Sequence, residues 1–418
     1  MAQQVNPRVA IGIDIGTSKV AITVGQHKEG LISVIGLGTA PNAGLRRGII
    51  EDTDEVISSL SAAIEQVHRV SGVTIDHGVL GINGVGTKTV ISKSMVAVTQ
   101  GDGQITEAEV DSVVEAAQSV ALPLNHEIVH VFPSIFTIDG QEKTKDPVGM
   151  RGLRLEGEIL VVGVPTVSIT NLTKITDQAD IAADGIIFNS IASARAILTK
   201  KQKEQGVILI DIGAGTTSYA VYEEGDLIDA NVIPVGSSHI TNDIAIGLKT
   251  TLENAEKIKC EHLDADPARV RDQVLDLAKI SDGEQGTVSK KQVVEIADAR
   301  LKELFSMVRK EIKRIKRDAM LPAGAVLTGG GAKLKGIVQQ AKENLDLPAQ
   351  LGVPSLEVGG TIDKLDDPSY STSIGLMLFG LEMKPQEGTS GGFKFNFKNQ
   401  KMGDFAQKAR NIFKHFLP

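Results

Sequence analysis

The chain has 418 residues, 41% of them hydrophobic and 23% charged, so it holds enough apolar material for more than one buried core. Its formal net charge of -8 argues against a general nucleic-acid-binding protein, because no excess of Lys and Arg is available to neutralise a phosphate backbone. The single cysteine, Cys260, excludes an internal disulfide and a thiolate metal cluster. With no cationic and apolar leader and no run of about 18 apolar residues, the sequence predicts a cytoplasmic protein that does not span a membrane.

Two segments of the chain are similar to each other: residues 11–24, IGIDIGTSKVAITV, and residues 209–222, LIDIGAGTTSYAVY. In each, an apolar run ends in Asp, turns on glycines and small hydroxyl residues, and resumes as an alternating apolar run. This pattern predicts a β-hairpin in each segment and therefore two similar lobes. Alone, either segment fits a plain hairpin as well as a ligand-binding turn.

Three helices are predicted from N-capping residues that precede apolar side chains at helical spacing. They run from Asp52 or Thr53 to near Gly72, from Thr106 with Glu109 in a capping box, and from near Ser289 to a point before Pro322. Strands that alternate with such helices give an α/β fold class. The basic run at residues 309–318 fits a solvated helix face or a partner surface.

The two hairpin turns are candidates for binding a polyphosphate. Such a ligand needs backbone N–H donors at close range and a metal ion held by carboxylates. Asp14 and Asp211 are the candidate Mg²⁺ ligands, through water, and the candidates for positioning a catalytic water. The candidate phosphate-binding residues are Gly16, Thr17, Ser18 and Lys19 in the first turn and Gly213, Gly215, Thr216 and Thr217 in the second.

A third glycine-rich element lies at residues 325–336, AVLTGGGAKLKG. Gly329, Gly330 and Gly331 follow an apolar strand and open a predicted helix. Consecutive glycines there would let a flat ligand such as adenosine lie against bare backbone and a helix N-terminus. The spacing of a Walker A motif is not present, so the sequence does not predict a P-loop protein.

These three motifs, in this order, resemble those of the superfamily of actin, sugar kinases and heat-shock chaperones. The resemblance implies an actin-like, ribonuclease-H-like fold, duplicated in two lobes, with ATP and Mg²⁺ in the cleft. In that superfamily the two hairpins bind the phosphates from opposite lobes, and the glycine segment meets the adenosine.

Residues 128–159, IVHVFPSIFTIDGQEKTKDPVGMRGLRLEGEI, are similar to the inserted subdomain of the bacterial cell-division FtsA family. Residues 232–245 and 254–263 resemble the second lobe of that family. The resemblance of these two segments implies nucleotide contacts from Gly236, Glu256, Lys257 and Lys259. Ser218 lies where the family commonly has an acidic residue, so we expect weak or no ATPase activity.

The chain can therefore be divided into predicted parts. These are a first-lobe core at 1–83 and 164–200, an FtsA-type inserted subdomain at 84–163, a second-lobe core at 201–235 and 320–382, a second-lobe insertion at 236–319, a flexible linker at 383–401 and an amphipathic helix at 402–418. Within the linker, the alternating run GFKFNF could instead dock as a strand.

The last predicted helix has the pattern of a membrane-surface helix. From residue 383 onward seven basic side chains oppose two acidic ones, a net charge of +5. Sixteen helical residues extend about 24 Å, less than the ~30 Å of a bilayer core, so the helix would lie in the interface with anionic lipids. Packing of this helix on its own domain is the alternative. The candidate membrane-contacting residues are Met402, Phe405, Lys408, Arg410, Ile412, Phe413, Lys414, Phe416 and Leu417.

The resemblance implies an ATP-binding scaffold that polymerises on the inner face of the plasma membrane and anchors FtsZ filaments at the division site. The implied partners are the FtsZ C-terminal peptide, bound on the second-lobe insertion, further copies of the chain, anionic lipids and other division proteins. No nucleic acid is expected. The alternatives are an actin-like ATPase of a pilus or secretion assembly, and a sugar-kinase-like phosphotransferase, for which no catalytic base can be identified in the sequence.

Overall fold

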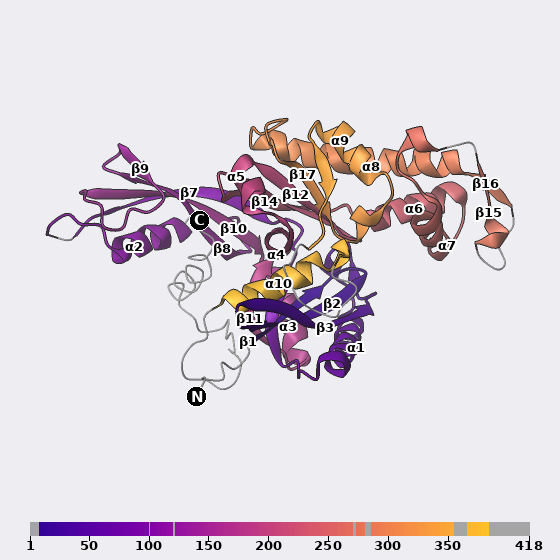
Figure 1. Ribbon diagram of the computed structural model, residues 1–418, viewed down its shortest axis with the longest axis horizontal. Coiled ribbons are helices and arrows are strands. Elements are labelled where there is room, and N and C mark those ends of the chain that lie inside the picture. The colour runs from indigo at the N-terminus through magenta and orange to yellow at the C-terminus, as the bar shows by residue number, and fades with distance from the viewer. Residues whose placement is uncertain are drawn as a thin grey trace.

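A computed structural model describes residues 8–99, 101–119, 122–270, 273–280, 286–354 and 366–383. In Figure 1 the first lobe lies below, the second lobe lies above it, and two further parts project from them on opposite sides. None of the helices in the described part is long and apolar enough to cross a membrane. The predicted linker beyond Met383 and the predicted amphipathic helix at 402–418 lie outside the described residues.

Each lobe is built on a five-stranded sheet with the same topology, in the order β11-β6-β1-β2-β3 in the first lobe and β18-β17-β12-β13-β14 in the second. In both sheets an antiparallel three-stranded meander is followed by two parallel strands. The predicted hairpins and the predicted duplication are therefore confirmed. The first-lobe strands are β1 (Arg8–Ile15), β2 (Lys19–Lys28), β3 (Leu31–Pro41), β6 (His77–Ile82) and β11 (Ala182–Phe188). Their second-lobe counterparts are β12 (Val207–Ile212), β13 (Thr217–Glu223), β14 (Asp226–Ile233), β17 (Gly324–Thr328) and β18 (Ala349–Leu351).

Local capping explains where the predicted helices begin. The Asp52 side chain accepts hydrogen bonds from two backbone N–H groups of α1 (Thr53–Ser71), and Gly72 ends that helix at a φ of 70°. Thr106 and Glu109 form the predicted capping box of α2 (Glu107–Gln118). Ser289 caps α8 (Lys290–Arg314), which ends well before Pro322 because Lys316 adopts a left-handed conformation.

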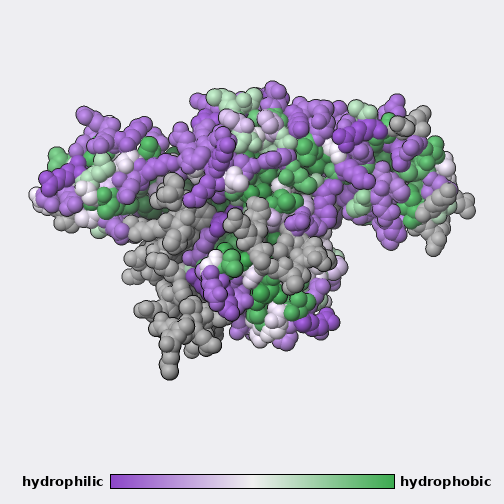
Figure 2. All heavy atoms as spheres, viewed as in Figure 1, coloured by the Kyte–Doolittle hydropathy of each residue, from purple (hydrophilic) through white to green (hydrophobic). Residues whose placement is uncertain are grey.

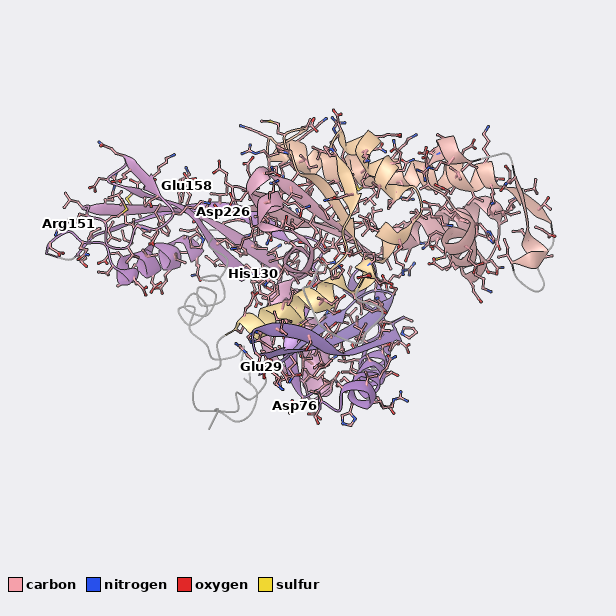
Figure 3. All side chains as sticks on the ribbon, in the orientation of Figure 1. Glu29, Asp76, His130, Arg151, Glu158 and Asp226 are labelled. Carbon is pink, nitrogen blue, oxygen red and sulfur yellow. The ribbon has the colours of Figure 1, made fainter. Side chains whose placement is uncertain are left out.

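The inserted subdomain is a separate antiparallel sheet in the order β7-β10-β8-β9, covered by α2. Its strands are β7 (Lys88–Ala97), β8 (His126–Ile138), β9 (Glu142–Thr144) and β10 (Arg154–Pro165). Figure 3 shows His130 where this sheet meets the first lobe, and its buried Nε2 accepts a hydrogen bond from the Phe188 N–H at 2.9 Å. Burial lowers the pKa of His130 to about 3, so the ring is neutral in the folded protein.

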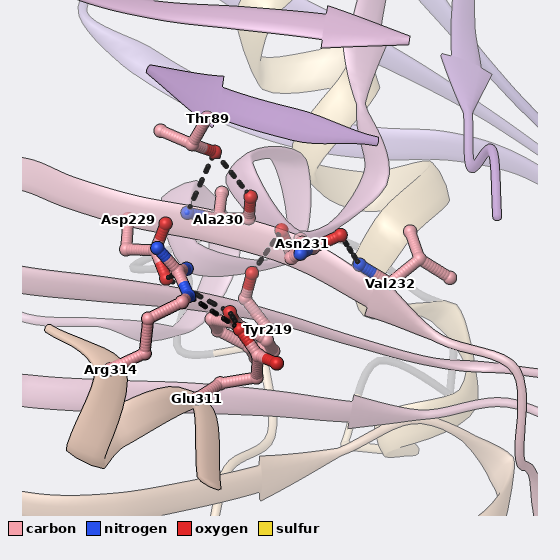
Figure 4. Close-up of polar contacts among 9 residues, drawn as sticks. Thr89, Tyr219, Asp229, Ala230, Asn231, Val232, Glu311 and Arg314 are labelled. Carbon is pink, nitrogen blue, oxygen red and sulfur yellow. Dashed lines mark hydrogen bonds and ion pairs between the residues drawn. The ribbon is translucent and has the colours of Figure 1, made fainter. Parts of the chain in front are cut away.

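The inserted subdomain also contacts the second lobe. Lys145 forms an ion pair with Asp226 at 2.9 Å and donates to the carbonyl of Glu224 at 2.8 Å. The Thr89 hydroxyl of β7 donates to the Ala230 carbonyl on the neighbouring β14, as Figure 4 shows. The insert is thus attached to the first lobe by its chain and by contacts of β8 with β11, and to the second lobe by polar contacts.

Two buried helices lie between the sheets, α4 (Asn189–Ile197) and α10 (Ser371–Glu382). The α10 segment was expected in the second-lobe core, but it packs on β1, β2 and β6 of the first lobe as well as on α4. It is apolar on all sides because it is buried on all sides. The close approach requires glycine: a Cβ added to Gly12 would lie 2.2 Å from the Ser373 carbonyl, and one added to Gly375 would lie 1.8 Å from the Ala192 carbonyl.

Further strands and helices complete each part of the molecule. The first lobe is completed by β4 (Leu45–Arg46), β5 (Ile49–Ile50) and α3 (Thr166–Gln178), and the second lobe by α5 (Lys200–Gln205) and α9 (Ile337–Leu345). The second-lobe insertion contains α6 (Ser237–Leu248), α7 (Leu252–Lys257), a π-helical turn at Ile258–His262, the hairpin β15 (Val274–Asp276) and β16 (Thr287–Ser289), and α8. On the face shown in Figure 2, hydrophilic residues predominate over this insertion and over the inserted subdomain.

The three arginines of the basic run at 309–318 are tied to carboxylates of their own lobe. Arg309 pairs with Asp318 at 2.8 Å, Arg314 with Asp229 at 2.6 Å, and Arg317 with Glu223 at 2.7 Å. Arg314 and Arg317 tie the end of α8 to strands β14 and β13, and the charges of all three arginines are matched within the fold.

Candidate functional site

A cavity of about 810 Å³ lies between the two lobes. Its walls are formed by both hairpin turns, by the glycine segment and by residues of the π-helical turn. The two hairpin turns meet here, since a Cβ added to Gly215 would lie only 2.7 Å from the Thr17 hydroxyl. The sequence repeat thus produces two turns that face each other across one cavity.

Two carboxylates lie at equivalent places in the lobes, each one residue before the end of its strand: Asp14 is half-buried and Asp211 is buried. Asp211 Oδ2 accepts hydrogen bonds from the Ser193 hydroxyl at 2.7 Å and the Thr372 hydroxyl at 3.1 Å. Asp14 Oδ1 accepts from the Asn189 amide at 3.2 Å. Burial and the nearby Asp211 raise the pKa of Asp14 to about 7, and burial also raises the pKa of Asp211. A cation between these groups would relieve the cost of burying both charges.

Two asparagines in the cavity wall have side-chain oxygens without a partner. Asn83 Nδ2 donates to the Thr216 hydroxyl at 2.9 Å, but the Oδ1 atoms of Asn83 and Asn189 are buried and accept no hydrogen bond from the described residues. The Asn189 amide thus holds Asp14 and the Asn83 amide holds Thr216, so both side chains fix groups of the cavity wall. No group of three or more His, Cys, Asp or Glu in the described part of the chain could hold a metal ion by itself. The two carboxylates are oxygen donors of the kind that hold Mg²⁺ through water.

Four of the described lysines line the cavity, Lys19, Lys259, Lys333 and Lys335, and three of them have side-chain partners in the site. Lys259 Nζ donates to Glu256 at 2.7 Å and to the Thr241 hydroxyl at 2.9 Å, and Lys333 pairs with Asp367 at 2.7 Å. Lys19 Nζ instead donates to the Ser369 hydroxyl at 3.0 Å and lies 3.8 Å from the centre of a tyrosine ring. Burial lowers the pKa of Lys19.

The glycine segment differs in detail from the prediction. Gly330 begins a single 3-10 turn, Gly330–Lys333, and α9 begins only at Ile337, because Gly336 adopts a φ of 80° and breaks the helical path. Gly329 has a φ of 84° and a ψ of 171°, a conformation that L-residues with a side chain rarely adopt. A Cβ on Gly329 would lie 2.3 Å from Asp211 Oδ1, so this glycine lets the segment pass against the carboxylate.

Most predicted site residues line the cavity, and three do not. The lining set is Asp14, Gly16, Thr17, Ser18, Lys19, Asp211, Gly213, Gly215, Thr216, Glu256, Lys259, Gly329, Gly330 and Gly331. Thr217 is buried and its hydroxyl donates to the Val235 carbonyl at 2.8 Å. Gly236 packs against the backbone of Ala214, and Lys257 pairs with Glu253 at 3.5 Å outside the cavity wall. The prediction did not include Asn83, Asn189, Lys333, Ser369 and Thr372, which also line the cavity.

Comparison with known proteins identifies the family. The model of the domain described as "SHS2 domain inserted in FTSA" matches residues 84–163, and that of "Cell division protein FtsA" matches residues 208–375. The chain is 35% identical to cell division protein FtsA of Pseudomonas aeruginosa over 93% of its own length and 93% of that protein. The chain belongs to the FtsA family. It is also 34% identical to the FtsA protein of Bacillus subtilis over 93% of this chain and 87% of the relative.

Comparison with solved structures shows that the fold of this chain is actin-like. A structure of the PilM-PilN type IV pilus biogenesis complex superposes with a TM-score of 0.63 at 16% identity, and covers 89% of this chain and 98% of that one. MreB5 of Spiroplasma citri bound to ADP gives a TM-score of 0.52 at 15% identity, with 89% and 96% covered. At these identities the likeness concerns the fold alone. The predicted fold class and the resemblance to FtsA are confirmed.

Proposed function

We propose that this chain is an ATP-binding, actin-like cell-division protein that polymerises on the cytoplasmic membrane and anchors FtsZ filaments at the division site. The observation that carries the nucleotide part is the convergence of two hairpin turns, a glycine segment and the carboxylates of Asp14 and Asp211 on one cavity. Membership of the FtsA family supports the role in cell division.

The cavity offers a place for each part of Mg²⁺-ATP. The turns at 16–19 and 213–216 would hold the phosphates, Asp14 and Asp211 would hold the metal through water, and the glycine segment with Glu256 and Lys259 would meet the adenosine. The metal ion would neutralise phosphate charge. Ser218 also lines the cavity but has no carboxyl group, so the chain lacks one group that could polarise an attacking water, and we expect weak or no hydrolysis.

Anchoring would depend on the predicted amphipathic helix at 402–418. One short helix binds a membrane weakly, whereas many helices presented by one polymer bind together through avidity. The proposed cytoplasmic location on the inner face of the plasma membrane, and the proposed contacts with FtsZ, with further copies of the chain and with anionic lipids, follow from this arrangement and from the family.

Cys260 provides a direct test of nucleotide binding, because it is the only cysteine and it lines the cavity. Burial and the nearby Glu256 raise the pKa of its thiol, so labelling by a maleimide should be followed at pH 8 or above. With Mg²⁺-ATP at 100 times its Kd, only ~1% of the protein stays unbound, and alkylation should slow by about tenfold or more. Asp211→Asn should remove this protection.

Two controls accompany the alkylation experiment. Cys260→Ser should take up no label, and Lys257→Ala, outside the cavity wall, should keep the protection seen in the unaltered chain. Equal alkylation rates with and without Mg²⁺-ATP in a folded protein would contradict the nucleotide assignment.

Anchoring is tested by co-sedimentation with liposomes that contain anionic lipid. The full chain with ATP should pellet with the liposomes, and a chain ending at residue 401 should stay in the supernatant, because it lacks the basic and apolar residues at 402–418. Raised salt should weaken pelleting of the full chain. If both chains pelleted equally, the helix would not be the anchor.

A further inference from the structure

Residues 367–373, which comprise a 3-10 turn and the first residues of α10, contact every motif of the candidate nucleotide site. Their contacts are Lys333 with Asp367 at 2.7 Å, the Gly329 N–H with the Pro368 carbonyl at 3.2 Å, Lys19 with Ser369 at 3.0 Å, and Thr372 with Asp211 at 3.1 Å. No site role was predicted for this segment, and its contacts with the two hairpin turns span at least 161 residues of sequence.

Lys19 is held in an unusual way within this arrangement. Its ammonium lies 3.8 Å from the centre of the Tyr370 ring and donates to the Ser369 hydroxyl. Among the described residues no carboxylate forms an ion pair with it, whereas Lys259 and Lys333 in the same cavity wall are paired with Glu256 and Asp367. The charges of Asp14, Asp367 and Asp211 act on the ammonium from a distance, but none of these carboxylates is in ion-pair contact with it.

An aromatic face and a hydroxyl stabilise an ammonium without cancelling its charge. A phosphate would have to displace a carboxylate partner before it could bind the ammonium. The negative charge of that carboxylate would also repel the phosphate. Ordering a lysine side chain costs rotamer entropy. Because the ring of Tyr370 already restricts Lys19, less of this entropy is lost when a ligand binds. Lys19 is thus ordered in advance and still able to attract an anion.

The partners of Lys19 are themselves fixed. The Ser369 N–H donates to Asp367 Oδ1 at 2.9 Å, and the Pro368 carbonyl accepts from the hydroxyls of Thr328 and Ser371. Tyr370 is 7% exposed and packs in the first-lobe core. A rigid support of this kind is what holds a binding group within a few tenths of an ångström.

We propose that Tyr370 and Ser369 are positioning residues for Lys19, which hold its ammonium in the cavity so that the polyphosphate of a nucleoside triphosphate meets a charge already in place. This inference rests on the proposed nucleotide-binding function. It gives residues 367–373 a role in affinity for the phosphate chain, in addition to their place at the start of a core helix.

The test is a double-mutant cycle read out as the Kd for Mg²⁺-ATP. Tyr370→Leu removes the aromatic face and should weaken binding by roughly 5- to 30-fold, whereas Tyr370→Phe keeps the face and should stay within about twofold of the unaltered chain. In a Lys19→Ala background, Tyr370→Leu should change the Kd by less than about twofold, because its effect acts through Lys19. Thermal unfolding of each variant shows whether it is folded.

The outcomes separate the inference from the function on which it rests. Unchanged ATP affinity in folded Tyr370→Leu, or an equal loss with and without Lys19, would overturn the positioning role while the nucleotide site stands. If Tyr370→Leu does not fold, Ser369→Ala in the same cycle decides, with a smaller expected loss that must again vanish without Lys19. An unaltered chain that binds no nucleotide would overturn both.

Discussion

Replacing Gly329 with alanine is expected to abolish ATP binding and to lower the free energy of unfolding by about 3 kcal/mol. The added Cβ would lie 2.3 Å from Asp211 Oδ1 and 2.6 Å from the Ile212 carbonyl, both of them fixed by the central strand β12. The backbone at φ 84° and ψ 171° is also one that alanine adopts only under strain. Either the glycine segment or Asp211 must move, and both line the cavity.

Gly330→Ala is the matched control for this prediction. The nearest atom to its added Cβ is Ser369 Cβ at 3.9 Å, an ordinary contact, so the stability should change by less than about 1 kcal/mol. ATP affinity should still fall, since the methyl group enters the cavity that the nucleotide would fill. Urea unfolding and the Kd for ATP, measured on both variants, separate the two effects. Equal stability of the two variants would show that the glycine segment tolerates a side chain at Gly329.

The parts of the fold that could be predicted from the sequence are those determined by local chemistry. The hairpins follow from alternation around Gly16 and Gly213, and α1 and α2 begin where Asp52 and Thr106 cap them. The hairpin pattern occurs twice in the sequence, and this repeat alone predicts the two-lobed architecture. Helical geometry also predicts that Lys259, and not Lys257, lies beside Glu256. Only Lys259 is three residues after Glu256 and therefore on the same helix face.

The rest depended on contacts between distant residues that carry no local signal. Ser369 and Lys19 are 350 residues apart, and a serine before an apolar helix predicts a cap rather than a lysine partner. Asn189 begins α4 beside Asp14, but an asparagine after a strand is as often a turn residue. The apolar pattern of α10 shows that the helix is buried without showing which lobe buries it. Thr217 was predicted at the site as part of the second turn, yet strand alternation turns its hydroxyl toward Val235.

The second large effect is expected at Arg314, where Arg314→Ala should lower the free energy of unfolding by about 2–3 kcal/mol at neutral pH. Figure 4 shows the arrangement: Arg314 donates to Asp229 at 2.6 Å and to Glu311 at 2.8 Å, and Tyr219 donates to Asp229 at 2.9 Å. Asp229 is only 1% exposed. Without the arginine its carboxylate keeps the Tyr219 hydroxyl as a partner but loses its neutralising charge.

Arg309→Ala, on the same helix, is the matched control. Arg309 pairs with Asp318, which is 31% exposed and can be hydrated, so the loss of unfolding free energy should be less than half as large as for Arg314→Ala.

The effect of Arg314→Ala should also depend on pH. Burial raises the pKa of Asp229, and Arg314 opposes that rise, so removing the arginine moves the folded-state pKa further above the unfolded value. Between these two values the folded state binds more protons, and stability falls as pH rises. Urea unfolding at pH 5 and pH 8 should therefore show the larger deficit at pH 8, and an equal deficit at both would mean that Asp229 is not the group Arg314 neutralises.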